Sequence, residues 1–277
     1  MTIPMENESF DKKLSQQRCL KYRKRILDIS QTVSALHGAG AFSAMEMVDC
    51  IYHGLMRRDT DGASPDTFLM SKGHSCMVQY VILEEMGVLR KEDLDLYCKP
   101  NGRLGCHPDY GVPGIEASTG SLGHGMGLAV GMAHTDKSRG DDRKIYIVIS
   151  DGELQEGSTW ETMMMAANLE VNNLIAFIDH NGSQSFGHTR ETHPKFYPIR
   201  EKIEAFGWEC AEVNGHDVDA VFNAVKQRKG GKPFMVIGNT VKGKAVSFME
   251  HQPMWHYRSP NPAEYQQAIT ELKEVNS

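Results

Sequence analysis

Two apolar runs constrain the fold of this chain more than any other feature. They are Ile145–Ile149 and Leu174–Ile178, and a stretch of helical character from about Glu156 to Leu169 separates them. A short, continuous run rich in β-branched residues is typical of a strand buried on both faces of a parallel sheet. Strands that alternate with helices indicate βαβ units. The sequence therefore predicts an α/β fold.

Polar residues follow both predicted strands at the point where each strand ends. Asp151 and Gly152 follow the first strand, and Asn181 follows the second. Ligands of open α/β sheets bind outside the carboxyl ends of the strands, so these side chains should share one rim. A carboxylate, an amide oxygen and the backbone carbonyl of Ser183 suit Mg²⁺ bound to a diphosphate, which Gly152 would let approach the backbone. The alternative is a pair of ordinary turns, since Asp-Gly and Asn-Gly are common turn dipeptides.

Further apolar stretches extend this alternation along the chain. We expect more strands at Asp66–Ser71, Gly207–Val213 and Pro233–Gly238. We expect helices at Asp11–Leu36, Ser43–Met56, His216–Lys229 and in a tightly buried small-residue stretch that reaches Ala133. This order predicts a doubly wound, mostly parallel sheet with helices on both faces. We expect a single domain over residues 1–277, with a flexible arm over 1–10 and a C-terminal extension over 250–277.

Composition excludes several classes of protein. The net charge of −6 argues against nucleic acid as a partner. The six cysteines include no C-x-x-C pair, which favours reduced thiols over a disulfide framework or a zinc site. No apolar run approaches the roughly 20 residues that cross a bilayer, and the amino-terminal residues lack the apolar core of a signal peptide. We therefore expect a cytoplasmic protein with no membrane partner.

The segment that begins at Asp151 resembles the thiamine diphosphate motif of the transketolase family, G-D-G-x-x-x-E-G followed after about thirty residues by N-G. The matching residues are Asp151, Gly152, Glu156, Gly157, Asn181 and Gly182. The resemblance implies the thiamine-diphosphate-binding fold, with thiamine diphosphate and Mg²⁺ as cofactors and Ca²⁺ or Mn²⁺ as substitutes for Mg²⁺. It implies metal ligation by Asp151, Asn181 and Ser183. It also places Gly152, Glu153 and Ser185 at the cofactor, although Ser185 stands where the family usually has an apolar residue.

Four further segments of the chain resemble family motifs that carry a histidine. His37 and His107 match histidines that contact the substrate, His74 matches one that reaches the diphosphate, and His256 matches one that lies near both. The resemblance thus assigns His37, His107 and His256 to catalysis, and His74 and His256 to cofactor binding. The alternative for an isolated histidine such as His74 is a capping or core role. Three flanking residues depart from the family pattern, namely Leu36, Cys106 and Tyr257.

The run from Gly114 to Gly125 resembles the family motif G-x-E-x-x-T-G-x-L-G-x-G. The resemblance implies that Gly120 and Gly123 let this loop pass close to the cofactor. It also implies that Leu122 packs against the thiazolium ring. Three residues of this loop, Gly120, Leu122 and Gly123, therefore join the predicted cofactor site.

The resemblance implies a transferase that moves a two-carbon ketol unit from a ketose to an aldose, with sugars or sugar phosphates as substrates. Histidines suit the proton transfers of that reaction near neutral pH. Transketolases usually have chains more than twice this length, in which a second domain binds the aminopyrimidine. The chain therefore resembles the amino-terminal subunit of a split transketolase, active with a separate carboxyl-terminal, pyrimidine-binding subunit. We expect an α₂β₂ assembly with self-association around Glu156.

Two other functions remain open from the sequence. The first is another ketol or acyl transfer on the same scaffold, of the deoxyxylulose-synthase type. The second is a non-catalytic module that binds thiamine diphosphate. Retention of the metal ligands and of the motif histidines argues against the second.

Overall fold

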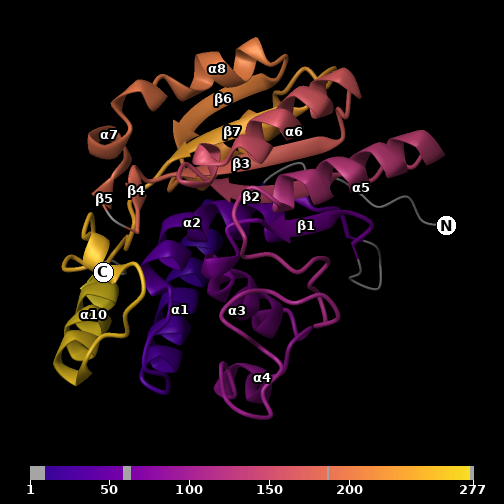
Figure 1. Ribbon diagram of the computed structural model, residues 1–277. Coiled ribbons are helices and arrows are strands. Elements are labelled where there is room, and N and C mark those ends of the chain that lie inside the picture. The colour runs from indigo at the N-terminus through magenta and orange to yellow at the C-terminus, as the bar shows by residue number, and fades with distance from the viewer. Residues whose placement is uncertain (1–9, 59–63, 186, 275–277) are drawn as a thin grey trace.

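The computed structural model describes residues 10–58, 64–185 and 187–274 of the chain (Figure 1). Within these residues, five parallel strands form one sheet in the order β1-β2-β3-β7-β6. Its strands are β1 (Thr67–Met70), β2 (Ile145–Ser150), β3 (Leu174–His180), β6 (Glu209–Asn214) and β7 (Phe234–Asn239). The expected parallel α/β sheet is confirmed. A separate antiparallel pair, β4 (Ser183–Gln184) and β5 (Gly187–His188), follows β3 directly.

Helices cover both faces of the sheet, as the sequence predicted (Figure 1). In chain order they are α1 (Lys12–Ser30), α2 (Gly38–Cys50), α3 (Met77–Glu85), α4 (Lys91–Asp95), α5 (Gly125–Arg139), α6 (Gly157–Asn168), α7 (Thr189–Thr192), α8 (Ile199–Ala205), α9 (Val218–Lys226) and α10 (Pro262–Glu274). Helices α5, α6 and α8 pack on one face, and α1, α2, α3, α9 and α10 belong to the core of the other.

The strand β2 shows why its sequence folds this way. Every one of its residues is buried, and successive side chains point to opposite faces of the sheet. Ile145, Ile147 and Ile149 pack into the core under α5 and α6, whereas Tyr146 and Val148 pack into the core on the side of α2 and α3. A strand whose side chains pack into two cores must be apolar at every position, which is the pattern that the sequence displays.

Helix α2 begins at Gly38, five residues earlier than the sequence predicted, and α1 ends at Ser30 rather than near Leu36. The reason is tertiary, because every residue of α2 is buried. Its small residues let it approach its neighbours closely: a Cβ atom at Gly40 would lie 2.7 Å from the Ser75 hydroxyl oxygen. Burial thus outweighs the low helix propensity of glycine.

Helix α5 corrects a second expectation. The sequence predicted a tightly buried helix up to Ala133, but α5 extends to Arg139 and exposes one side. Leu128 on that side is 43% exposed. The helix lies on the outer surface of the sheet beside α6, so only its inward residues, such as Met126 and Ala133, reach the core.

The two ends of the chain meet different neighbours. Most of the arm expected over residues 1–10 lies outside the described residues, but the ring of Phe10 stacks on Phe222 at 5.9 Å. Near the other end, α10 packs on α1, and the Tyr265 hydroxyl donates a hydrogen bond to Asp28 at 2.7 Å. The single-domain assignment stays a prediction. None of the helices in the described residues is long and apolar enough to span a bilayer.

Candidate active site

Four parallel strands, β1, β2, β3 and β7, end at the same edge of the sheet, where the start of α2 joins them. A cavity of about 530 Å³ lies there. Its wall is formed by His37, Gly40, Lys72, His74, His107, Gly120, Leu122, Ser150, Gly152, Gln155, Glu156, Asn181, Ser183, Gln184, Ser185, His193, Lys242 and His256. The rim that was predicted from two strands is therefore built from four.

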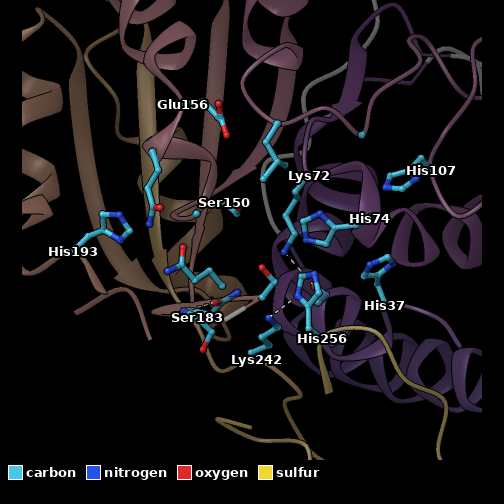
Figure 2. A pocket seen from close by; sticks show the side chains of 18 residues that line it. His37, Lys72, His74, His107, Ser150, Glu156, Ser183, His193, Lys242 and His256 are labelled. Carbon is cyan, nitrogen blue, oxygen red and sulfur yellow. Dashed lines mark hydrogen bonds between the residues drawn. The ribbon is translucent and has the colours of Figure 1, made fainter. Parts of the chain in front are cut away.

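Four histidines from separate segments gather on one side of the cavity, and His193 lies across from them (Figure 2). The ring of His37, just before α2, lies 5.4 Å from that of His74, 6.1 Å from that of His107 and 5.2 Å from that of His256. The rings of His74 and His256 are 5.5 Å apart. All four predicted histidines thus meet at one place.

Burial keeps three of these imidazoles neutral near pH 7. It lowers the pKa of His37 to about 3, with a further contribution from His256. It lowers the pKa of His256 to about 4, helped by the nearby charge of Lys242. Burial also pushes the pKa of His74 well below its usual range. A neutral imidazole has one donor and one acceptor nitrogen, so these groups can hydrogen-bond hydroxyl and carbonyl oxygens.

His107 owes its place to Gly120. The Gly120 backbone has a φ of +143°, and a Cβ atom there would lie 2.8 Å from Cδ2 of His107. Only glycine combines this backbone conformation with so close an approach. The glycine-rich loop therefore positions His107 as well as Leu122, and both line the same wall.

Two lysines of the cavity wall were not predicted from the sequence. Lys72, just after β1, is 1% exposed, and Lys242, after β7, is 4% exposed. Nζ of Lys242 lies 3.0 Å from Nδ1 of His256, which must accept because an ammonium group only donates. The remaining ring proton of His256 therefore sits on Nε2. Both lysines come shortly after a buried strand. The same position in the sequence had indicated Asp151 and Asn181 as site residues.

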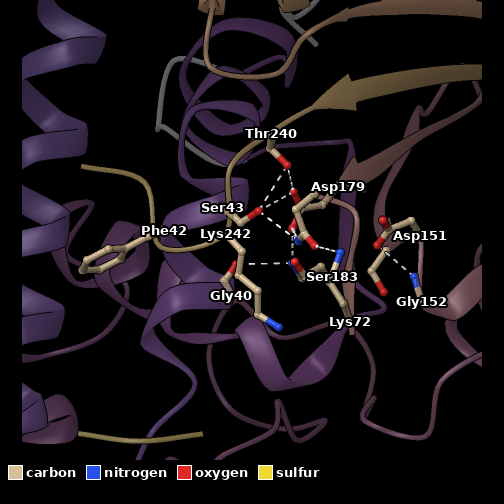
Figure 3. A network of polar contacts seen from close by, with 12 residues as sticks. Gly40, Phe42, Ser43, Lys72, Asp151, Gly152, Asp179, Ser183, Thr240 and Lys242 are labelled. Atoms are coloured by element: carbon tan, nitrogen blue, oxygen red, sulfur yellow. Dashed lines mark hydrogen bonds and ion pairs between the residues drawn. The ribbon is translucent and has the colours of Figure 1, made fainter. Parts of the chain in front are cut away.

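The predicted metal ligands lie together, but not all of them face the cavity. Figure 3 shows two of them, Asp151 and Ser183. Asn181 and Ser183 line the wall. Asp151 is fully buried behind it, where Oδ1 accepts a hydrogen bond from the Gly152 amide at 2.9 Å and Oδ2 accepts one from the Gly182 amide at 2.7 Å. Burial and the neighbouring carboxylate of Asp179 raise the pKa of Asp151 to about 7.

Glu153, which was expected at the cofactor, is fully buried and does not line the cavity. Its Oε1 accepts hydrogen bonds from the Ser71 hydroxyl and, at 2.9 Å, from the Gly123 amide. Gly123 likewise lies behind the wall, held by this contact. Glu153 therefore ties the ends of β1 and β2 to the glycine-rich loop instead of facing the cavity.

The cavity fits an anionic ligand that carries hydrogen-bonding groups. Two lysines, Lys72 and Lys242, line it; Asp179 balances the charge of Lys72, so Lys242 supplies the positive charge for a ligand. Nδ1 of His37 and Nε2 of Gln155 are buried at its wall without a hydrogen-bond partner in the described residues. Buried polar atoms are normally paired, so these two atoms mark places where a ligand would complete the hydrogen bonding.

A divalent cation also fits, provided that oxygen donors other than carboxylates supply most of its ligands. The described residues contain no group of three or more His, Cys, Asp or Glu side chains able to hold a metal ion. The predicted set supplies one carboxylate, one amide oxygen and one backbone carbonyl, and Mg²⁺ characteristically adds phosphate oxygens and water to such a partial set. The donor chemistry therefore suits Mg²⁺ bound together with a diphosphate.

Comparison with known proteins gives the same family as the motifs. Residues 15–256 match the transketolase family's thiamine diphosphate binding domain. The chain is 36% identical over 259 residues to one of the subunits named for the apulose-4-phosphate transketolase of Phocaeicola vulgatus, covering 92% of both proteins. It is 35% identical over 257 residues to the 6-deoxy-6-sulfo-D-fructose transketolase subunit of a Clostridium species, covering 91% of this chain and 93% of that one.

The solved transketolase of Campylobacter jejuni superimposes with a TM-score of 0.87 at 25% identity, over 95% of this chain and 43% of that enzyme. The chain thus spans less than half the length of that transketolase but nearly the full length of the proteins named as subunits. It belongs to the transketolase family, as a thiamine-diphosphate-binding transferase subunit that corresponds to the amino-terminal part of the longer enzyme.

Proposed function

We propose that this chain is the diphosphate-side subunit of a two-subunit enzyme that transfers a two-carbon ketol unit from a ketose to an aldose. The observation that carries the proposal is the convergence of His37, His107 and His256 with the predicted cation ligands around one cavity. When bound, thiamine diphosphate supplies the nucleophilic carbon and the electron sink that such a transfer requires.

The cation side of the cavity would hold the diphosphate. Asp151, Asn181 and the backbone carbonyl of Ser183 would bind Mg²⁺, for which Mn²⁺ or Ca²⁺ could substitute. The cationic Lys242 lines the same cavity and would bind phosphate oxygens, and the absence of a side chain at Gly152 would let the diphosphate approach the backbone. Ammonium groups form strong hydrogen bonds to anionic oxygens.

The histidine side would bind the sugar. His37 and His256 are neutral near pH 7, so each ring has one donor and one acceptor nitrogen. Nε2 of His256 carries the proton because Nδ1 accepts from Lys242. His256 can thus donate to a carbonyl or hydroxyl oxygen, and His37 and His107 can position or exchange protons with the neighbouring hydroxyl groups.

The substrates we propose are ketoses and aldoses, with sugar phosphates among them. Two relatives are named for apulose 4-phosphate and 6-deoxy-6-sulfo-D-fructose. Both names describe a sugar with an anionic substituent. An assay panel should therefore compare phosphorylated, sulfonated and uncharged ketoses as donors.

A separate pyrimidine-binding subunit would complete the enzyme, and we propose an α₂β₂ assembly. The names of the relatives, which describe them as subunits, support a partner chain. Self-association would use the face that carries Glu156, because Leu128, Met164 and Met165 on α5 and α6 are 43%, 43% and 51% exposed there. A cytoplasmic location is supported by the six cysteines, which lie within the described residues and are all free.

The test is reconstitution with the product of an adjacent gene that encodes a transketolase carboxyl-terminal half. Ketose-to-aldose transfer should need both chains, thiamine diphosphate and Mg²⁺, and the mass of the complex should equal two copies of each chain. The complex with Asp151→Ala serves as the inactive control. Robust turnover by this chain alone would refute the two-subunit proposal. Cofactor binding without turnover in any combination would instead favour the non-catalytic module.

A further inference from the structure

We propose that Asp179 is a positioning residue for the cation site: it fixes the amide of Asn181 so that the oxygen, and not the nitrogen, is presented to the metal. Asp179 is the residue of β3 that lies two positions before Asn181, and it was not among the predicted site residues. The inference rests on the proposed cation site, because it concerns how one of that site's ligands is held.

The side chain of Asp179 is fully buried and accepts four hydrogen bonds (Figure 3). Its Oδ1 accepts from the hydroxyl of Ser43, at 2.7 Å, and from the hydroxyl of Thr240. Its Oδ2 accepts from the ammonium group of Lys72 and from Nδ2 of Asn181, the latter at 3.1 Å. An ionised carboxylate can only accept, so donors must face both of its oxygens.

This environment determines which way the Asn181 amide faces. One Nδ2 hydrogen is directed to Asp179 and the other to the Ser43 oxygen at 3.1 Å. Oδ1 of Asn181 accepts from the Ser183 amide at 2.9 Å and has a second lone pair left for a ligand. A reversed amide would place its oxygen against the carboxylate and turn its nitrogen, which cannot ligate a hard cation, toward the site.

Lys72 gives the network its charge balance. It is 1% exposed, pairs with Asp179 and also lies 3.3 Å from the Gly40 carbonyl oxygen at the start of α2. Replacing Asp179 alone would therefore leave a buried ammonium group without its counterion. The two effects of Asp179, charge and orientation, must be separated by changing both partners.

The variant Asp179→Asn should disturb the orientation. Ser43 and Thr240 both donate to Oδ1, so the new amide oxygen would take that place. Its NH₂ group would then face the NH₂ group of Asn181, and Asn181 would turn. Loss of a residue that orients a metal ligand typically lowers metal affinity by about 10- to 100-fold.

The decisive variant is Lys72→Met combined with Asp179→Asn, because the pair keeps its net charge of zero while Asn181 loses its acceptor. The wild type is the charge-matched control, because its Lys72–Asp179 pair also has a net charge of zero. The readout is the Mn²⁺ dissociation constant at saturating thiamine diphosphate, from the electron paramagnetic resonance signal of free Mn²⁺, using the chain assembled with its partner subunit. Circular dichroism and thermal unfolding of each variant report the fold.

We expect the double variant to regain thermal stability relative to Asp179→Asn but to bind Mn²⁺ about 10- to 100-fold more weakly than the wild type. Equal Mn²⁺ affinity in the double variant and in the wild type would overturn the inference and leave Asp179 with a charge-balancing role only. The variant Asp151→Ala tests the proposed cation site independently of the role of Asp179. If Asp151→Ala binds Mn²⁺ like the wild type, the proposed cation site is wrong. If it loses Mn²⁺ binding, the site is supported, and a failure of the double-variant test refutes only the role of Asp179.

Discussion

Gly152 offers a test of the cofactor site in which protein stability and ligand binding should move in opposite directions. Its backbone has φ −62° and ψ −35°, an ordinary right-handed conformation that alanine adopts without strain. A Cβ atom there would meet nothing closer than the Ser150 hydroxyl at 3.8 Å and Cβ of Gln184 at 3.9 Å. Both residues line the cavity, so the added methyl group would enter the cavity and clash with no protein atom.

The variant Gly152→Ala should therefore stabilise the free protein while it weakens cofactor binding. Alanine at a compatible position typically adds about 0.4–1 kcal/mol by restricting the unfolded chain, which corresponds to a rise of about 1–4 °C in Tm. The Gly152 amide already donates to Asp151, so the methyl group would act by excluding a phosphate oxygen from the space beside this backbone. Loss of one charge-assisted hydrogen bond of the displaced phosphate costs about 1.5–3 kcal/mol. Thiamine diphosphate affinity should then fall about 10- to 150-fold.

Isothermal titration with thiamine diphosphate and Mg²⁺, together with thermal unfolding, measures both quantities. Gly231→Ala is the matched control, because a Cβ atom at Gly231 has no neighbour within 4 Å and the residue does not line the cavity. It should leave the affinity unchanged. Wild-type affinity in a folded Gly152→Ala protein would refute the placement of the diphosphate against this backbone.

Three other experiments test the remaining parts of the site. Asp151→Ala should abolish Mg²⁺-dependent binding of thiamine diphosphate in titration calorimetry with an unchanged circular dichroism spectrum, and retained affinity would contradict the metal assignment. His37→Ala and His107→Ala should lower kcat of the assembled enzyme by about 10²- to 10⁴-fold with little effect on cofactor affinity, whereas His74→Ala should mainly weaken cofactor binding; similar behaviour of all three would contradict this division. Burial lowers the pKa of Lys242 to about 8, and a bound diphosphate should raise it again, so binding should take up protons above pH 8 and weaken as pH rises through that value. Titrations in buffers of different ionisation enthalpy would detect this proton uptake. A thiamine diphosphate affinity that does not change between pH 7 and 9.5 would exclude it.

The fold class and two of the four strand ends that form the site could be predicted from the sequence. A strand buried on both faces must be apolar throughout, so Ile145–Ile149 and Leu174–Ile178 were recognisable without a structure. Because parallel strands end at a common edge, the residues just beyond them, Asp151 and Asn181, could be placed together. Both inferences use only local periodicity and chain direction, which the sequence displays directly.

The first residue of α2 could not be predicted from the local sequence pattern. Gly38 and Gly40 indicate a break between helices, because glycine disfavours a helix in isolation. In the folded chain the segment is completely buried, and the missing side chain at Gly40 lets it approach Ser75 closely. The free energy of that packing comes from neighbours distant in sequence, so it cannot be predicted from the residues around Gly38.

The roles of Lys72 and Asp179 depend entirely on how the strands are arranged in the sheet. The two residues are 107 positions apart in the sequence, and their strands, β1 and β3, are separated in the sheet by β2. In the sequence, Lys72 is indistinguishable from a solvated lysine, and Asp179 shares its strand end with Asn181. Only the fold shows that the lysine is buried and that its ammonium group meets the carboxylate that orients Asn181. A buried charge needs a partner of opposite sign, and strand order in the sheet, which local sequence does not encode, determines which partner it meets.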